Sequence, residues 1–175
     1  MSVETEPQQQ EKGPFAGYAP PDERPPLGSF AALTALFNAG FAAALAGAGR
    51  RGRLPDRVGA GDVVLIGTAS HKLSRLISKD KVTAFARAPF TEYEGQAGPG
   101  ELSESVRGSG LRRAVGELIA CPYCLGLWVA AGMHVGLLWA PRTTRVVAST
   151  MTALTISDFL QIAYKAAEEK GLGGS

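Results

Sequence analysis

Apolar residues occur along the chain in long blocks that are separated by polar segments. The first block, residues 27–49, contains no charged side chain, and Asn38 is its only strongly polar one. A helix of this length measures about 34 Å, which is enough to cross a hydrocarbon core of about 30 Å. The pattern therefore predicts a first transmembrane helix over residues 27–49.

Two further apolar blocks lie in the C-terminal half of the chain. Residues 114–140 carry no charge after Glu117, and residues 146–164 form a second block that a charged tail follows. Each block is long enough to be a transmembrane helix. The connection between them has five residues, which predicts that the two helices are antiparallel neighbours.

Residues 58–77 form a weaker block. Its apolar centre has about a dozen residues, Asp62 interrupts it, and His71 and Lys72 end it. This is short for a span, so we expect a helix that is partly buried or lies at the membrane interface. The alternative is a short fourth span whose flanking cations extend to the interface.

The remaining segments are polar. Residues 1–26 are rich in Glu, Gln, Pro and Gly, and we expect a disordered leader. We expect residues 78–113 to form a loop, with one amphipathic turn before Pro89 and a flexible linker over GQAGPGELSESVRGSG. The expected fold is all-α: an integral membrane bundle of three spans plus one short membrane-associated helix.

The charge distribution predicts orientation and excludes some partners. A net charge of +2 is too small to indicate a nucleic-acid partner, and the acidic N-terminus does not resemble a signal peptide. Of the 18 Lys and Arg residues, 12 lie between Arg50 and Arg113. The positive-inside rule then places loop 78–113 and the C-terminus in the cytoplasm, with either three or four spans.

The tetrapeptide Cys121-Pro122-Tyr123-Cys124 places two candidate thiols on one helical turn. Pro122 suits the first helical position, which makes Cys121 the N-cap and lowers its thiol pKa through the helix dipole. The pair could exchange disulfides, or serve as small packing residues at a helix start. Tetrahedral zinc needs four ligands, and His134 lies about 15 Å along the helix from Cys124. We therefore expect no metal site and no cofactor.

Two features of the C-terminal spans bear on packing and charge. Gly132 and Gly136 form a small-residue face, which favours close helix packing within the bundle over a dedicated dimer interface. Asp158 lies inside the third span, where an unpaired acid is costly. We expect it to pair with an arginine (Arg75, Arg112 or Arg113). The alternative is a role in an ion or proton pathway.

Three motifs resemble a bacterial family known as domain of unknown function 1360, some members of which are called sporulation proteins. The motifs are HKLSRLISKDKV with ARAPF, then GELIACPYCLGLW, then SDFLQIAY. The resemblance implies a small helical membrane protein with a family core over residues 58–170, and it favours membrane entry of the 58–77 helix. Its motif positions here are Arg75, Asp80, Arg87, Glu117, Cys121, Cys124, Trp128 and Asp158.

These observations predict a multi-pass protein of a bacterial inner membrane that acts as a structural or assembly component without catalysis. Its partners would be the lipid bilayer and either another membrane protein or a second copy of the chain. One alternative is a thiol-redox or metal-handling protein that uses Cys121 and Cys124. Another is an accessory subunit of a transporter that uses Asp158.

Overall fold

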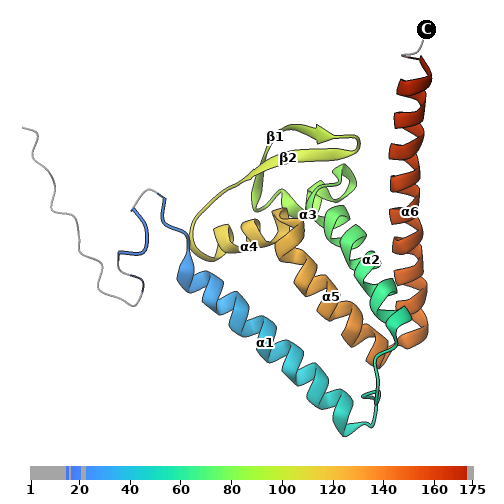
Figure 1. The fold of residues 1–175 in the computed structure, drawn as a ribbon. Coiled ribbons are helices and arrows are strands. Elements are labelled where there is room, and N and C mark those ends of the chain that lie inside the picture. Colours follow the sequence, from blue (N-terminus) through green and yellow to red (C-terminus); the bar gives the residue numbers. More distant parts are fainter. Residues whose placement is uncertain (1–14, 16, 21–22, 173–175) are drawn as a thin grey trace, which may run out of the picture.

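The computed structural model describes residues 15, 17–20 and 23–172 (Figure 1). Four long helices form a bundle, and a β-hairpin with several short helices lies at one end of it. In chain order the elements are α1 (Leu27–Arg50), α2 (Ala60–Ser78), η1 (Lys81–Thr83), α3 (Ala84–Arg87), β1 (Thr91–Gly98), β2 (Glu101–Val106), α4 (Gly110–Ala120), α5 (Pro122–Trp139) and α6 (Pro141–Leu172).

The long helices alternate in direction between two ends of the molecule (Figure 1). The hairpin end carries β1, β2, α4 and the C-terminal part of α6, and the turn end carries the connections α1–α2 and α5–α6. Helix α2 packs against both α5 and α6. The buried centre of the bundle is formed by Ile66, Ala69, Met133 and Ala148.

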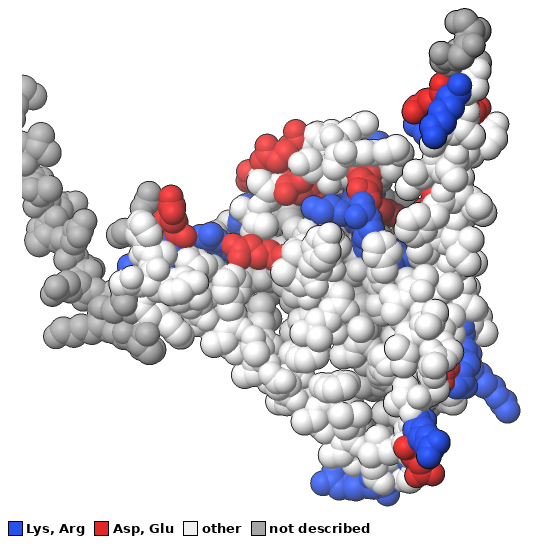
Figure 2. Space-filling view, in the orientation of Figure 1, with Lys and Arg blue, Asp and Glu red and all other residues white. Residues whose placement is uncertain are grey.

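In the part of the chain that the structure describes, three helices, α1, α5 and α6, are long and apolar enough to cross a membrane. In α1, all of whose residues the structure describes, Ala48 alone is buried. A helix that is apolar on every side is usually covered by protein or by lipid. Figure 2 shows Lys, Arg, Asp and Glu at the two ends of the helices, with an uncharged belt between them on this face.

Helix α2 is a central member of the bundle, which agrees with the partly buried helix predicted over residues 58–77 and not with a helix that lies only at the membrane interface. Its buried residues include Ser70, Ser74 and Ser78 as well as Ile66 and Ala69. Small side chains let two helix backbones approach closely, so a short apolar stretch can still form the centre of a bundle. Helix α2 runs beside α5 and α6 from the turn end to the hairpin end.

The predicted helix over residues 114–140 is two helices, with a break at Cys121. Cys121 is extended (φ −106°, ψ 110°), because a residue before proline disfavours the helical conformation. Helix α4 therefore lies across the end of the bundle while α5 runs along it (Figure 1). Helix α6 begins at Pro141 and continues through the charged tail to Leu172, well beyond the predicted 146–164.

The all-α prediction is wrong at residues 91–106, where the structure has an antiparallel hairpin in place of a flexible linker. Pro99 and Gly100 make the turn, and Gly100 has φ +78°, a conformation that glycine adopts without strain. The hairpin is also bonded to the preceding chain. Leu102 N–H donates to the Lys79 carbonyl, and Lys81 N–H donates to the Gly100 carbonyl, each at 2.9 Å. These distant contacts stabilise strands whose glycine and glutamate content disfavours β structure.

Arg87 joins three segments at the hairpin end. Its side chain is 0% exposed. It forms an ion pair with Glu104 of β2 and donates to the Ile77 carbonyl at 2.7 Å and the Thr83 hydroxyl at 2.8 Å. A fourth bond reaches the Asp80 carbonyl at 3.2 Å. We call this arrangement the Arg87 clamp. It satisfies one of the carbonyls that the C-terminus of α2 leaves unpaired.

The predicted leader over residues 1–26 lies largely outside the described residues. Within the described part, the Arg24 carbonyl accepts a hydrogen bond from Arg113 Nη1 at 3.2 Å, so the chain just before α1 contacts α4.

Replacement of Arg87 with methionine is expected to lower the stability of the hairpin end by about 3–5 kcal/mol, because Glu104 is then left buried without its partner. Arg87→Lys should also destabilise, since a single ammonium cannot reach all four acceptors. Thermal unfolding of the purified protein in detergent, together with proteolysis of the hairpin, measures the effect. Lys81→Met removes an exposed cation from the same segment and serves as the control. Equal melting temperatures for the Arg87 and Lys81 variants would contradict the clamp.

A matched pair of glycines tests the packing of α4. A Cβ at Gly116 would lie 2.6 Å from Val106 Cγ1 and 3.0 Å from the Phe90 carbonyl, whereas a Cβ at Gly132 meets nothing within 4 Å. Gly116→Ala should therefore destabilise the protein by about 1–3 kcal/mol through overpacking. Gly132→Ala should leave the melting temperature unchanged or raise it slightly. A larger loss at Gly132 than at Gly116 would refute this packing.

Candidate functional site

A cleft of about 570 Å³ opens between α2, α6 and the turn of the hairpin. We call it the charged cleft because titratable side chains of both signs line it. Helix α2, the segment that follows it, the hairpin and α6 all contribute. The titratable residues are His71, Lys72, Arg75, Asp80, Glu101, Asp158 and Lys165.

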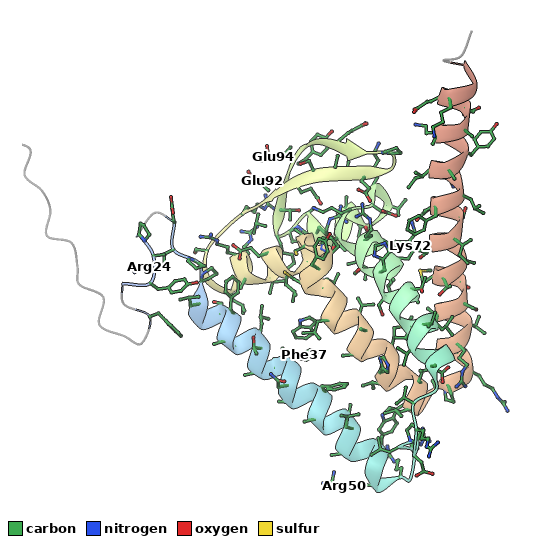
Figure 3. The ribbon with its side chains drawn as sticks, in the orientation of Figure 1. Arg24, Phe37, Arg50, Lys72, Glu92 and Glu94 are labelled. Atoms are coloured by element: carbon green, nitrogen blue, oxygen red, sulfur yellow. The ribbon has the colours of Figure 1, made fainter. Side chains whose placement is uncertain are left out.

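An ion pair between Lys72 and Asp158 joins the two helices in the cleft, with Nζ 2.8 Å from Oδ2. The Lys72 side chain is 16% exposed and that of Asp158 is 47% exposed. Figure 3 shows Lys72 on the side of α2 that faces α6. The pair lies one turn beyond Thr155, whose hydroxyl donates to the Thr68 carbonyl at 3.5 Å. The parallel register of α2 and α6 therefore selects Lys72 as the partner.

None of the three arginines that the sequence offered to Asp158 pairs with it. Arg75 pairs with Glu101, Arg112 donates to the Pro89 carbonyl at 2.6 Å, and Arg113 pairs with Glu117 at 2.8 Å. The ion-pair interpretation of Asp158 agrees with the geometry, whereas the partner prediction is wrong. The pairing of Lys72 depends on the register between two helices, which residue spacing along the chain does not reveal.

Glu101 is the second cleft residue that the sequence did not single out. It begins β2, and an antiparallel bridge places it opposite Asp80. From there its carboxylate accepts a hydrogen bond from Arg75 Nη2 on α2. No short-range signal marks this residue, because it falls in the segment whose composition predicts a flexible linker.

Asp80 is partly buried and takes no part in these pairs. Among the described residues, no side chain donates a hydrogen bond to its carboxylate. Burial raises the pKa of Asp80 above its usual value; Glu101 and Asp158 raise it further, while Lys72 and Arg75 oppose the shift. On the opposite wall, Lys165 has no hydrogen bond or ion pair to any residue within 23–172. The cleft thus presents one carboxylate and one ammonium without partners.

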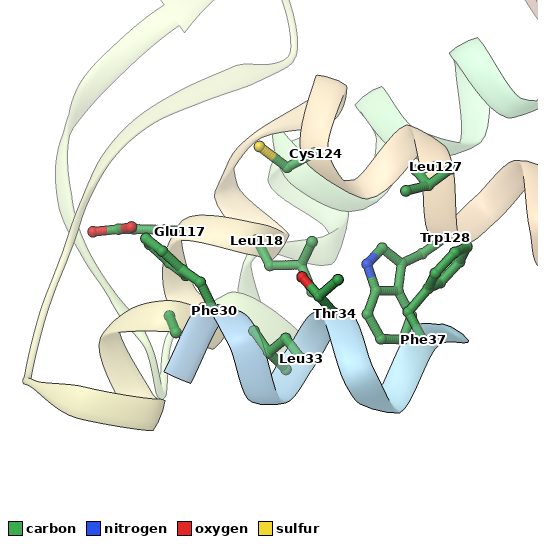
Figure 4. A pocket seen from close by; sticks show the side chains of 10 residues that line it. Phe30, Leu33, Thr34, Phe37, Glu117, Leu118, Cys124, Leu127 and Trp128 are labelled. Atoms are coloured by element: carbon green, nitrogen blue, oxygen red, sulfur yellow. The ribbon is translucent and has the colours of Figure 1, made fainter. Parts of the chain in front are cut away.

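A second, apolar pocket of about 340 Å³ lies between α1, α4 and α5 (Figure 4). Trp128 contacts Phe37 edge to face, with ring centroids 5.0 Å apart. Figure 4 shows the carboxylate of Glu117 directed away from the pocket, where Arg113 pairs with it. The motif positions Glu117, Cys124 and Trp128 therefore belong to this pocket, whereas Arg75, Asp80 and Asp158 belong to the charged cleft.

Cys121 is the N-cap of α5, as the proline spacing predicted. Its sulfur accepts a hydrogen bond from the Cys124 N–H at 3.3 Å, and both thiols are free. Burial raises the pKa of Cys121, but hydrogen bonds from the Cys124 thiol and from two backbone amides, with the charge of Lys79, outweigh it and lower the pKa overall. The described residues contain no group of three or more His, Cys, Asp or Glu side chains that could hold a metal ion.

The remaining predicted positions lie elsewhere. Arg87 is in the clamp behind the charged cleft. A Cβ at Gly136 would lie 2.7 Å from the Thr144 hydroxyl, so this glycine allows α5 and α6 to approach at the turn end, whereas Gly132 faces open space. His134 Nδ1 lies 2.9 Å from the Ala130 carbonyl in its own helix.

Comparison with known proteins identifies relatives of the core. The family described as "protein of unknown function (DUF1360)" matches residues 65–164. This segment contains the Arg87 clamp and every residue of the charged cleft except Lys165, whereas the α1 wall of the apolar pocket lies outside it. The sporulation protein YjcA of Bacillus subtilis (strain 168) is 34% identical over 71 residues, which are 39% of this chain and 60% of that protein. The UPF0713 protein YngL of the same organism is 33% identical over 89 residues, 50% of this chain and 65% of that protein. The chain thus matches less than two thirds of the length of each relative. No solved structure matches the chain.

The lowered pKa of Cys121 is testable by its alkylation rate as a function of pH. In a Cys124→Ser variant, which retains a hydroxyl donor, Cys121 should react with a midpoint below the ordinary thiol value of about 8.5. Cys124→Ala removes the side-chain donor and should raise the midpoint. Midpoints at or above the ordinary value in both variants would contradict the hydrogen-bonded cap.

Proposed function

The chain belongs to the DUF1360 family of proteins of unknown function, and we propose that it is a membrane-embedded structural or assembly component without catalysis. The observation that carries this proposal is the surface of α1, which has no charged side chain before Arg50 and leaves every residue except Ala48 at least partly exposed. Burial of such a surface in lipid removes it from water. In this proposal the bilayer covers the outer faces of α1, α5 and α6.

We further propose that α2 crosses the membrane as a fourth helix. It runs beside α5 and α6 between the same two ends, so it traverses whatever layer they traverse. Its ionisable groups at the two levels are paired. Arg145 of α6 reaches Asp62 at the turn end at 3.0 Å, and Lys72 meets Asp158 toward the hairpin end. Pairing lowers the cost of placing charges near or within the hydrocarbon.

With four crossings, the cations must be counted separately at the two ends of the bundle to predict orientation. The fold separates the cations between Arg50 and Arg113, because α2 carries the chain from the turn end to the hairpin end. By the elements that carry them, the described cations at the turn end are Arg50, Arg51, Arg53, Arg57, Arg142 and Arg145, and those toward the hairpin end are Arg24, Lys72, Arg75, Lys79, Lys81, Arg87, Arg107, Arg112, Arg113, Lys165 and Lys170. The larger number supports a cytoplasmic hairpin end in a bacterial inner membrane.

At the turn end, the chain is fixed near the proposed interface by aromatic and cationic contacts. The guanidinium groups of Arg51 and Arg53 lie 4.7 Å and 5.2 Å from the ring centroid of Trp139. Arg53 also donates to the Trp139 carbonyl at 3.0 Å. Tryptophan and arginine are typical of the membrane–water boundary.

Within this proposal the hairpin, α4 and the charged cleft form the surface that faces the cytoplasm, where assembly partners would bind. The partner is another membrane protein or a second copy of the chain. The name of the relative YjcA associates that protein with sporulation, and we extend this association to the present chain as the process it serves.

A thiol-redox function is the second candidate, and the capping geometry of Cys121 favours it. Cys121 would be the attacking thiolate and Cys124 the resolving thiol, since both lie on one turn. The alkylation measurement on Cys121 tests the first requirement of this function, a thiolate that forms near neutral pH.

Cysteine accessibility distinguishes four crossings from three. On a Cys121→Ser/Cys124→Ser background, single cysteines at Asp56, Gln96 and Lys170 report on the turn end, the hairpin and the C-terminus. In spheroplasts, a membrane-impermeant maleimide should label Asp56→Cys directly, and should label Gln96→Cys and Lys170→Cys only after permeabilisation. Labelling of Asp56→Cys and Gln96→Cys from the same side would refute a crossing by α2. Recovery of the protein in the soluble fraction would refute membrane insertion itself.

A further inference from the structure

The charged cleft lies at a defined depth if the helices cross a bilayer. Lys165 follows Arg145 by about 20 residues, so the two cations are about 30 Å apart along α6, the thickness of a hydrocarbon core. Arg145 pairs with Asp62 at the turn end. Lys165 then lies at the opposite membrane surface, and the Lys72–Asp158 pair lies about 10 Å deeper, as the floor of the cleft.

The charges of the cleft favour a ligand that carries both signs. Three cations (Lys72, Arg75 and Lys165) face three carboxylates, and two ion pairs consume most of them. What remains available is the carboxylate of Asp80 and the ammonium of Lys165. A purely anionic ligand would meet the acids of the cleft, and a purely cationic one would meet its bases. A zwitterion with separated charges satisfies both free groups.

The cleft also has an apolar margin that opens outward. Phe159 and Ile162 line it and are 64% and 65% exposed. They extend the cleft along the outer surface of α6, where the proposed membrane lies. A ligand with a zwitterionic head and an apolar chain therefore matches the cleft better than a small polar molecule does.

We propose that the charged cleft binds a phospholipid whose headgroup carries a phosphate and a primary amine, as in phosphatidylethanolamine. The amine donates hydrogen bonds to Asp80, the phosphate lies against Lys165, and the acyl chains follow Phe159 and Ile162. This inference rests on the proposed function, since it needs the hairpin end at a membrane surface. The inference extends the proposed function by naming the class of lipid that the charged cleft binds.

The chemistry distinguishes this headgroup from two common alternatives. A phosphocholine headgroup has the same charges but no N–H, so it cannot donate to Asp80. A phosphoglycerol headgroup has the phosphate but no cation, so it leaves the partly buried carboxylate without a charged partner. The primary amine is therefore the feature that the cleft should select.

Native mass spectrometry of the full-length protein, purified from an equimolar mixture of phosphatidylethanolamine, phosphatidylcholine and phosphatidylglycerol, tests the proposal. We expect phosphatidylethanolamine to be retained over the other two by about threefold to tenfold, the effect of one hydrogen bond of typical net strength. Asp80→Asn, which keeps an acceptor oxygen but removes the charge, should reduce the preference over phosphatidylcholine. Lys165→Gln should weaken retention of all three lipids. Lys170→Gln, which removes a cation one turn beyond the cleft, should leave retention unchanged.

Further outcomes distinguish a failure of the lipid proposal from a failure of the proposed function. Binding of free O-phosphoethanolamine to protein in phosphatidylcholine nanodiscs, without a preference for the lipid, would replace the lipid with a soluble zwitterion and overturn the assignment. Equal retention of the three lipids, or an unchanged preference in Asp80→Asn with an unchanged melting temperature, would also overturn it. These results concern inserted protein, whereas failure to incorporate into nanodiscs would refute the proposed function itself.

Discussion

The buried guanidinium of Arg87 is the interaction on which the hairpin end depends. A charge removed from water is stable only when its hydrogen bonds are replaced, and here four acceptors from three segments replace them. The same contacts fix the direction in which the chain leaves α2. Once that direction is fixed, the backbone of Lys79 and Lys81 can pair with the hairpin, and Glu101 comes within reach of Arg75. The charged cleft is therefore a consequence of the clamp, although Arg87 does not line it.

A different constraint acts on the rest of the bundle: the charged side chains of its apolar helices must be paired. Helices α2 and α6 run in parallel, and their ionisable groups meet at two levels, Asp62 with Arg145 and Lys72 with Asp158. Between these levels, the hydroxyls of Thr152 and Thr155 donate to carbonyls of α2. The seam therefore contains polar groups, and the ionisable groups at both levels are paired. Such a seam is compatible with lipid on the outer faces of the helices.

The two cavities divide the motif residues by chemistry. The apolar pocket collects the aromatic rings of α1 and α5, together with Cys124, whereas the cleft collects charges from α2, α6 and the hairpin. Helix α4 lines the apolar pocket, and its close approach to the hairpin at Gly116 holds it in place. This division supports a binding function in the charged cleft that is independent of the thiols.

The sequence by itself determined the apolar helices, the family, and the helix start at Cys121, because each depends on residues that are close in the chain. Hydrophobic blocks give helix length, and proline fixes its neighbour locally. It also identified Arg75, Asp80 and Asp158 as positions of interest. Tertiary structure decided the partners. Lys72 rather than an arginine meets Asp158 because of the register between two helices, and the segment around Glu101 is a strand because backbone groups of residues 79–81 pair with it. Both depend on contacts between residues that are distant in sequence, which local composition does not encode.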